Sequence, residues 1–235
     1  MIANKLNTFC QCYREKRVLS AFKEIIRFKI YLPFLKFHGL LIDRYYGIDT
    51  EGIVELVSIS IEKDVGHRQE STPSNHILKI MKTLEITPED VFLDMGSGKG
   101  RTLLMAGMFP FKLIIGVDVS DKLNSVCKQN IEKMKIKLRA KNFLIITCNA
   151  AEYEIPDNST FIYFFNPFGM EVMKKVLNEI LASFDRNPRK ITIIWYNPKH
   201  EIIFQGINNL RKTREMNWRN FGLYRSRVVF YEVNR

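Results

Sequence analysis

Residues 91–101 read VFLDMGSGKGR, and this stretch decides the fold. The short, mostly apolar run Val91–Met95 predicts a buried strand. Three alternating glycines follow it and predict a tight turn, where backbone can approach a ligand closely. Apolar spacing then predicts a helix over residues 99–108. A strand, a glycine turn and a helix in this order are typical of nucleotide-binding α/β folds.

The rest of the chain continues this alternation. Strand-like runs that are apolar throughout and separated by helices indicate a parallel sheet covered on both faces. A helix opens near Pro73, and the C-terminal region predicts a hairpin of two strands. The predicted strands are 91–95, 113–118, 143–148, 161–165, 191–196, 221–224 and 226–233, with helices at 99–108, 121–138 and 170–184.

The N-terminal region differs from the rest in charge and pattern. Residues 5–46 have helical spacing with basic residues between the apolar ones, and residues 47–70 have no clear period. Residues 1–40 hold eight Lys and Arg against two Glu, a net +6 out of the formal +11 of the whole chain. We therefore expect a basic amphipathic helical extension at 1–46 and one α/β domain at 47–235. The extension suits an anionic partner or membrane surface, or else packs as a lid or is simply a solvated face.

Composition places the chain in an ordinary globular class. The 235 residues are 46% hydrophobic and 26% charged, and no run of about 18 apolar residues predicts a spanning helix. The four cysteines have no spacing typical of zinc sites or disulfide frameworks, and no signal peptide is evident. We expect a cytoplasmic protein without a metal site, with peripheral membrane contact as the alternative.

Two acidic residues narrow the range of ligands that the glycine turn could bind. Asp94 ends the first strand two residues before the turn, and Asp118 ends the next strand. The glycine spacing is G-x-G-x-G, which differs from the dinucleotide fingerprint and from the phosphate-binding P-loop. A carboxylate beside the turn would repel a pyrophosphate and attract a cationic amino group, whereas a strand-end acid can accept ribose hydroxyls. A nucleoside that carries an amino acid and no phosphate fits this pattern, which predicts S-adenosylmethionine as cofactor.

Several segments together resemble a known family. The stretch 91–106 resembles motif I of class I methyltransferases, and in particular that of the non-SET histone lysine methyltransferases and of a group of bacterial methyltransferases. The resemblance covers about residues 42–200. It implies a Rossmann-like fold with a mostly parallel seven-stranded sheet, a C-terminal hairpin and an N-terminal helical extension. The other segments that carry it are 43–52, 71–73, 111–118, 164–168 and 196–198.

The resemblance implies the cofactor-binding residues. The third predicted strand ends in Asn149-Ala150, where the family usually has an acid before a small residue; Asn can still accept a hydrogen bond from the adenine amino group. The implied cofactor-binding residues are Thr72, Asp94, Gly96, Ser97, Gly98, Gly100, Asp118, Val119, Asn149, Ala150 and Asn166.

The candidate catalytic segment is Asn166-Pro167-Phe168, directly after the fourth predicted strand. It resembles the [Asp/Asn/Ser]-Pro-Pro-[Tyr/Phe] motif of amino-directed methyltransferases, in which carbonyl oxygens hold an acceptor nitrogen and the ring stacks on its plane. One proline in place of two leaves oxygen acceptors open, and a strand-ending turn with a core Phe is the alternative. His67 is a weak candidate for a general base, and Asn197-Pro198 either lines the same crevice or forms a turn.

These patterns predict a methyltransferase with an unidentified nucleophilic acceptor. A protein lysine, or a small molecule or glycan, is favoured. An RNA methyltransferase is an alternative, because basic residues with interleaved aromatics in the N-terminal region suit RNA. A second alternative, from another class, is a non-catalytic S-adenosylmethionine-binding module.

Overall fold

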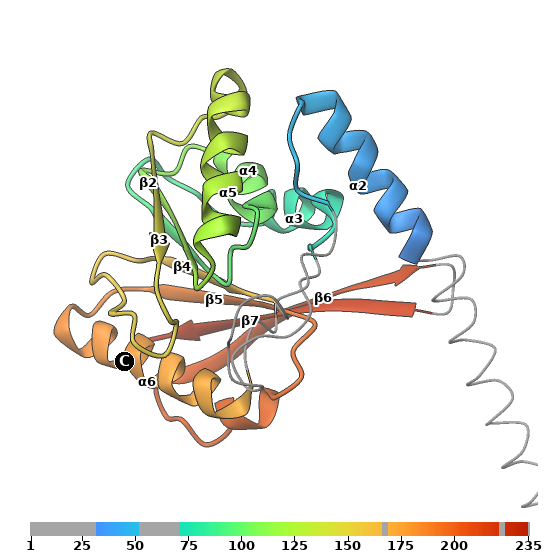
Figure 1. The fold of residues 1–235 in the computed structure, drawn as a ribbon. Helices are drawn as coiled ribbons and strands as arrows, with labels where there is room; N and C mark the ends of the chain where they lie inside the picture. Colours follow the sequence, from blue (N-terminus) through green and yellow to red (C-terminus); the bar gives the residue numbers. More distant parts are fainter. Residues whose placement is uncertain (1–31, 52–70, 166–168, 221–223, 235) are drawn as a thin grey trace, which may run out of the picture.

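The computed structural model describes residues 32–51, 71–165, 169–220 and 224–234. Its centre is a seven-stranded sheet in the order β3-β2-β1-β4-β5-β7-β6 (Figure 1). The first five strands in the chain pair in parallel, and β7 runs antiparallel to both of its neighbours. The strands are β1 Val91–Met95, β2 Leu113–Asp118, β3 Asn142–Thr147, β4 Phe161–Phe164, β5 Ile191–Tyr196, β6 Leu210–Asn220 and β7 Tyr224–Val233.

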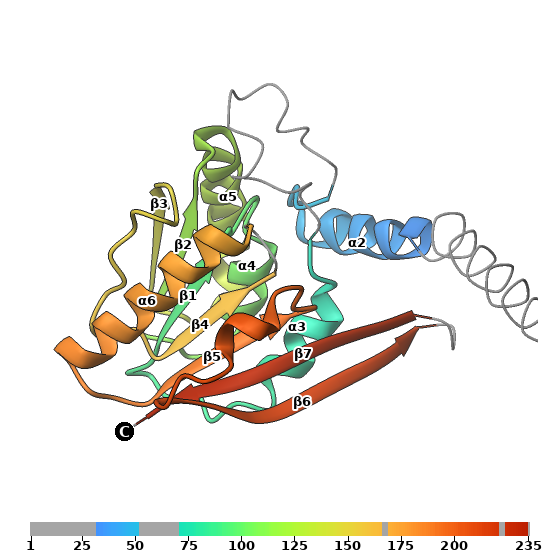
Figure 2. The same cartoon turned by 90° about the horizontal axis from the view of Figure 1, so that it is seen from below.

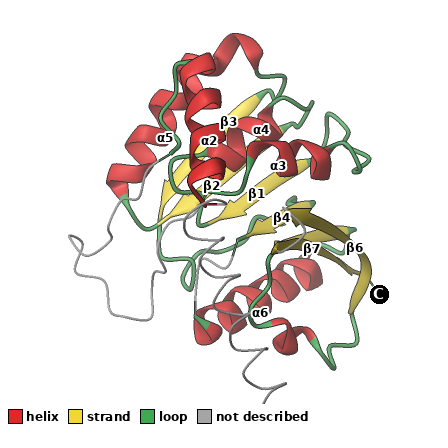
Figure 3. Ribbon diagram, turned by 90° about the vertical axis from the view of Figure 1, so that its right-hand side faces the viewer, coloured by secondary structure: helices red, strands yellow, loops and turns green. Residues whose placement is uncertain are grey.

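Helices cover both faces of the sheet (Figure 3). Helices α3, α4 and α5 lie on one face and α6 on the other. Helix α2 lies at the end of the molecule toward which the β6–β7 hairpin projects (Figure 2). The bounds are α2 Leu32–Tyr46, α3 Ser74–Met81, α4 Arg101–Gly107, α5 Asp121–Met134 and α6 Met170–Arg186, with short 3-10 turns η3 Lys135–Lys137 and η4 Glu201–Phe204.

The strict alternation of strand side chains assigns each residue of β1 to a face. Val91, Leu93 and Met95 pack in the core on the α6 side. Phe92 packs in the other core, beneath α3, α4 and α5. Asp94 shares the face of Phe92, so the carboxylate at the end of β1 points toward the layer that contains the glycine turn and α4.

The predicted fold class is confirmed, but one strand was predicted wrongly. The first hairpin strand was expected at 221–224, whereas β6 occupies Leu210–Asn220 and Tyr224 already belongs to β7; residues 221–223 lie outside the described part. β6 has the sequence LRKTREMNWRN, with four basic residues and one acid. It lies at the edge of the sheet, where charged residues are tolerated and deter pairing with other chains. Its sequence therefore lacks the apolar run that identified the buried strands.

The helix predicted before residue 46 is confirmed for α2, while residues 1–31 and most of the 47–70 connector lie outside the described part. On α2, Phe37 is 60% exposed and Tyr45 77% exposed, so these side chains do not pack as the apolar face of a lid would. No helix within the described ranges is long and apolar enough to cross a bilayer.

Gly100 occupies a position that only glycine fits. Its φ is +86°, and a Cβ there would lie 2.4 Å from the Sγ of Cys127. Gly206 has a similar φ of +76° but open space around it, so it serves as a control for backbone strain alone. We expect Gly100→Ala to lower the free energy of unfolding by about 2–4 kcal/mol and Gly206→Ala by about 1–2 kcal/mol in urea titrations. In a Cys127→Ala background the cost of Gly100→Ala should approach that of Gly206→Ala; an unchanged cost would contradict the steric explanation.

Candidate functional site

The glycine turn is held against the end of β2 by its own backbone. Gly96, Gly98 and Gly100 all have positive φ values, of 91°, 53° and 86°. The N–H groups of Gly96 and Ser97 donate to the carbonyl oxygen of Val117 at 2.8 and 3.1 Å. Gly98 N–H donates to Oδ2 of Asp118 at 2.9 Å. The turn thus places glycine backbone between the two strand ends that carry Asp94 and Asp118.

Asp94 is a buried carboxyl without a basic partner. It is 3% exposed, and its side chain has a hydrogen bond with Thr102. No ion pair joins it to any Lys, Arg or His in the part of the chain that the structure describes. Burial, and then the charge of Asp118, raise the pKa of Asp94 to about 8. The ligand-free site therefore favours the neutral acid, and a cation placed against it would favour the carboxylate.

The Asp118 carboxylate has more hydrogen-bond donors around it than that of Asp94. It accepts hydrogen bonds from Gly98 N–H and, at 3.0 Å, from Ser120 N–H. Burial still raises its pKa, because the two backbone hydrogen bonds only partly offset desolvation. Because burial raises the pKa of both acids, a positively charged ligand placed beside them would favour their ionised forms and gain more than it would in water.

The other predicted cofactor residues lie around this turn in different environments. The Thr72 hydroxyl is buried and lies 2.6 Å from the hydroxyl of Tyr163, which pairs with Asp94 across β1 and β4. Val119 follows Asp118 and is 36% exposed, whereas Ala150 packs in the core. Asn149 accepts a hydrogen bond from Ala151 N–H at 3.0 Å through Oδ1, so this oxygen already supports the local turn.

The predicted catalytic segment Asn166-Pro167-Phe168 lies outside the described residues, as does His67. Asn197 is described and forms a turn: its φ is +46°, and its Oδ1 accepts from the N–H of Arg227 at 2.8 Å. The side-chain oxygen of Asn197 thus joins β5 to β7, which favours the structural interpretation of Asn197-Pro198.

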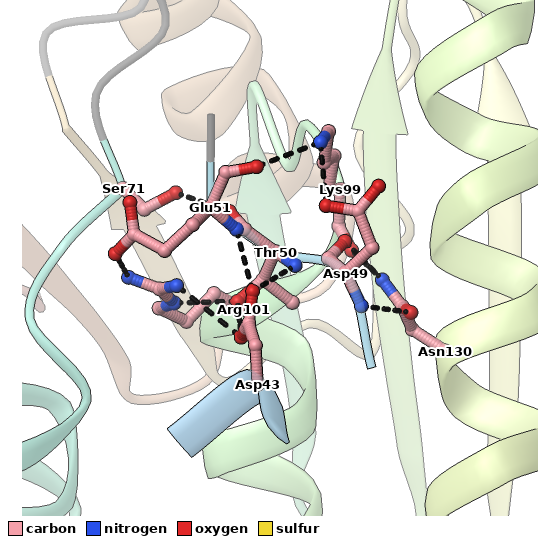
Figure 4. Close-up of polar contacts among 8 residues, drawn as sticks. All are labelled: Asp43, Asp49, Thr50, Glu51, Ser71, Lys99, Arg101 and Asn130. Carbon is pink, nitrogen blue, oxygen red and sulfur yellow. Dashed lines mark hydrogen bonds and ion pairs between the residues drawn. The ribbon is translucent and has the colours of Figure 1, made fainter. Parts of the chain in front are cut away.

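Residues 43–51, here called the 43–51 segment, make a set of contacts that the sequence patterns did not predict. Figure 4 shows that its acidic groups contact two basic residues of motif I, Lys99 and Arg101. Lys99 Nζ donates to Asp49 Oδ1 at 2.7 Å and to the carbonyl oxygen of Glu51 at 2.8 Å. Asn130 of α5 fixes the same segment by accepting from Asp49 N–H at 2.9 Å and donating to the Asp49 carbonyl at 2.7 Å.

Arg101 makes the most buried of these contacts. Its guanidinium is 5% exposed and donates to Glu51 Oε1 at 2.6 Å, to Thr50 Oγ1 at 2.7 Å and to Asp43 Oδ1 at 3.4 Å. Asp43 also accepts from the N–H and hydroxyl of Thr50, each at 2.6 Å. Asp43 lies in α2, so the last turn of this helix and motif I form one hydrogen-bonded unit across the expected boundary at residue 46.

The comparisons with known proteins identify the family. A family model described as "Histone methylation protein DOT1" matches residues 70–193, which is more than half of the chain. The chain belongs to the DOT1 family. A protein-lysine N-methyltransferase of Saccharolobus islandicus is 26% identical over 133 residues, covering 56% of this chain and 81% of that protein. A histone-lysine N-methyltransferase of Drosophila melanogaster is 41% identical over 46 residues, but these span 19% of this chain and only 2% of that protein.

Solved structures agree on the fold. An RNA methyltransferase from Salinibacter ruber in complex with S-adenosyl-L-homocysteine has a TM-score of 0.52 and 15% identity, covering 71% of this chain and 95% of its own. TrmN from Thermus thermophilus has a TM-score of 0.53 and 13% identity, covering 68% of this chain and 48% of its own. This DOT1-family chain is therefore a Rossmann-like, S-adenosylmethionine-dependent methyltransferase, and its acceptor is a separate question.

The residues present fit this cofactor. Asp94 supplies a buried carboxyl that lacks a cation, and Ser97 Oγ in the turn is buried with no hydrogen-bond partner in the described structure. A methionine ammonium would complement the first, and ribose hydroxyls would suit Asp118. Within the described ranges no group of three or more His, Cys, Asp or Glu side chains is arranged to hold a metal ion.

The protonation of Asp94 predicts a pH dependence of stability. In the unfolded chain this group loses its proton near 3.8, but in the folded protein near 8. Between these values only the folded state holds the proton, so the stability of the ligand-free protein falls as pH rises. Asp94→Asn removes this titration, so its melting temperature should exceed that of the wild type by about 3 °C or more at pH 8, and by less near pH 5.

Asp157 provides a matched control for this measurement. It pairs with Arg186, and that contact lowers its pKa, so Asp157→Asn should give no gain at pH 8. If the melting temperatures of wild type and Asp94→Asn differed equally at both pH values, the assigned cause would be wrong.

The Arg101 contacts predict a large structural effect. Arg101→Met leaves Asp43 and Glu51 without their buried partner, which should cost about 3 kcal/mol of unfolding free energy in urea titrations. Lys174→Met removes a pair with Glu171 whose side chains are 49% and 80% exposed, so it should cost less than about 1 kcal/mol. Equal costs for the two variants would show that the 43–51 segment adds nothing to the fold.

Proposed function

We propose that this methyltransferase methylates the side-chain amine of a protein lysine. Two comparisons support this acceptor over the small-molecule, glycan and RNA alternatives. The family model is named for histone methylation, and the archaeal relative, which matches over most of its length, is a protein-lysine N-methyltransferase. The structural neighbours support the fold alone, because their identities are too low to carry a substrate.

We assign the cofactor contacts to the residues around the glycine turn. Asp94 attracts the cationic methionine group, Asp118 accepts the ribose hydroxyls, and Gly96, Ser97, Gly98 and Gly100 let the backbone approach closely. Thr72, Val119, Asn149, Ala150 and Asn166 complete the predicted contacts. The observation that carries this assignment is the buried Asp94 carboxyl, which lacks a basic partner among the described residues. When bound, the cofactor supplies a methyl group activated by its sulfonium.

The acceptor contacts are proposed for Asn166, Pro167 and Phe168. The Asn166 carbonyl oxygen and a neighbouring backbone carbonyl would accept hydrogen bonds from the amine, which orients its lone pair toward the methyl group. The Phe168 ring would stack beside the amine and exclude water. In the sequence this segment follows β4, whose last residue, Phe164, pairs with Met95 at the end of β1. Holding the two reactants in line at about 3–3.5 Å supplies much of the acceleration of such a transfer.

The N-terminal region belongs to the same proposal. We propose that residues 1–46 form an extension and 47–235 the catalytic domain, and that the net +6 of residues 1–40 binds an anionic partner or membrane surface. We also propose a cytoplasmic location, which is consistent with cysteines that show no disulfide spacing.

Cofactor binding and transfer can be tested separately. Calorimetric titration with S-adenosylmethionine should show at least tenfold weaker binding for Asp94→Asn and Asp118→Asn, and unchanged binding for Asp157→Asn. Phe168→Ala should keep the wild-type affinity for the cofactor and reduce transfer about 100-fold. Transfer is measured with radiolabelled S-adenosylmethionine and a cell extract separated into protein, RNA and small-molecule fractions.

The location of the label decides the acceptor. We expect it in the protein fraction, as methyl-lysine after acid hydrolysis. Label confined to RNA or to small molecules would reject the lysine acceptor, and cofactor binding without any transfer would favour the non-catalytic module.

A further inference from the structure

Two buried polar pairs join residues 71–76 to the ends of two central strands. The Thr72 hydroxyl lies 2.6 Å from the Tyr163 hydroxyl of β4, and Nδ1 of His76 lies 2.7 Å from the Tyr196 hydroxyl of β5. Tyr163 pairs in register with Asp94, whereas Tyr196 is the last residue of β5. Residues 71–76 therefore contact both Tyr163, the register partner of Asp94, and Tyr196, the last residue of β5.

His76 is the centre of a continuous set of ring contacts. It is 3% exposed, and its ring stacks on Trp218 of β6 with centroids 4.4 Å apart and planes 14° apart. The Tyr196 ring in turn meets the Phe165 ring edge to face, at 5.0 Å and 85°. Phe165 is the residue directly before Asn166. The contacts thus run from the hairpin through α3 and β5 to the residue that precedes the acceptor segment.

The hydrogen bond in this set is neutral. Burial, and then the charge of Lys79, lower the pKa of His76 to about 4, so the ring is uncharged near neutral pH. A neutral imidazole has one donor and one acceptor nitrogen, and a tyrosine hydroxyl can complement either. A buried polar pair costs stability unless its hydrogen bond is made, and for that reason it selects one arrangement of the rings where an apolar pair would allow several.

We propose that His76 and Tyr196 are positioning residues for methyl transfer: their hydrogen bond fixes the Tyr196 ring, which packs against Phe165, the residue directly before the acceptor segment in the sequence. The inference rests on the proposed role of Asn166-Pro167-Phe168. Neither residue needs to touch the reacting atoms. Their effect should therefore appear in the transfer step and not in cofactor affinity. Loss of the Thr72–Tyr163 hydrogen bond, which lies beside Asp94, should instead weaken cofactor affinity and leave the transfer step unchanged.

The test compares two tyrosines that each lose a single oxygen atom. Tyr196→Phe should lower kcat/KM for methylation of the extract's protein fraction about 10- to 100-fold. Its dissociation constant for S-adenosylmethionine should stay within twofold of the wild type. Tyr163→Phe is the matched comparison and should weaken cofactor binding while leaving the half-saturating protein concentration unchanged.

Variants of His76 separate a positioning role from a loss of folding. His76→Gln keeps a group that can bond the Tyr196 hydroxyl, so it should retain more transfer than His76→Leu. If the two residues act through their hydrogen bond, the His76→Leu/Tyr196→Phe double variant should transfer no more slowly than the worse single variant. Circular dichroism melts identify variants that do not fold; His76→Gln preserves size and polarity and keeps the test available.

The outcomes distinguish this inference from the function on which it rests. Wild-type transfer by Tyr196→Phe, a parallel loss of cofactor affinity, or additive losses in the double variant would each overturn the positioning role. Unchanged transfer by Phe168→Ala would instead reject the acceptor segment itself. If Tyr196→Phe transfers methyl groups at the wild-type rate while Phe168→Ala does not transfer them, only the positioning role is rejected.

Discussion

The site contains two largely buried carboxyl groups, Asp94 and Asp118, whose ionisation lowers the stability of the folded protein. Asp94 and Asp118 lie at the ends of adjacent parallel strands, burial raises the pKa of both, and the charge of Asp118 adds to the cost of ionising Asp94. An arrangement of this kind destabilises the ligand-free protein and strengthens the binding of a cation. A positively charged group bound beside these carboxyls would offset part of that cost.

The 43–51 segment explains why nearby basic residues do not relieve this repulsion. Lys99 and Arg101 lie five and seven positions after Asp94, close enough in sequence to neutralise it. Instead they bond to Asp49, Thr50, Glu51 and Asp43. Lys99 and Arg101 thus pair with the 43–51 segment, and no basic side chain in the described part of the chain forms an ion pair with Asp94 or Asp118. Asp43, which lies in α2 and outside the α/β core, in this way helps to keep Arg101 paired away from Asp94.

The parts that could be predicted from sequence are those with local patterns. β1, β2, β4 and β5 are mostly apolar runs, and the glycine turn with Asp94 and Asp118 follows a fixed spacing. β6 could not be predicted, because an exposed edge strand needs no apolar period. The Arg101 contacts and the His76–Tyr196 pair join residues about 50 and 120 positions apart. No local pattern in a single sequence identifies such partners. The one related signal is that Asp49 and Glu51 have the same two-residue spacing as Lys99 and Arg101.

The strand order has a consequence for biosynthesis. β7 is the last strand to leave the ribosome, yet it inserts between β5 and β6. Until Tyr224–Val233 has been made, β5 has an open apolar edge and β6 has no neighbour to pair with. The nascent chain must therefore keep one side of β5 without its neighbouring strand until β7 has been made, although β4 already covers the other side. An apolar strand edge exposed in this way is prone to pair with other chains, and the insertion of β7 removes that exposure.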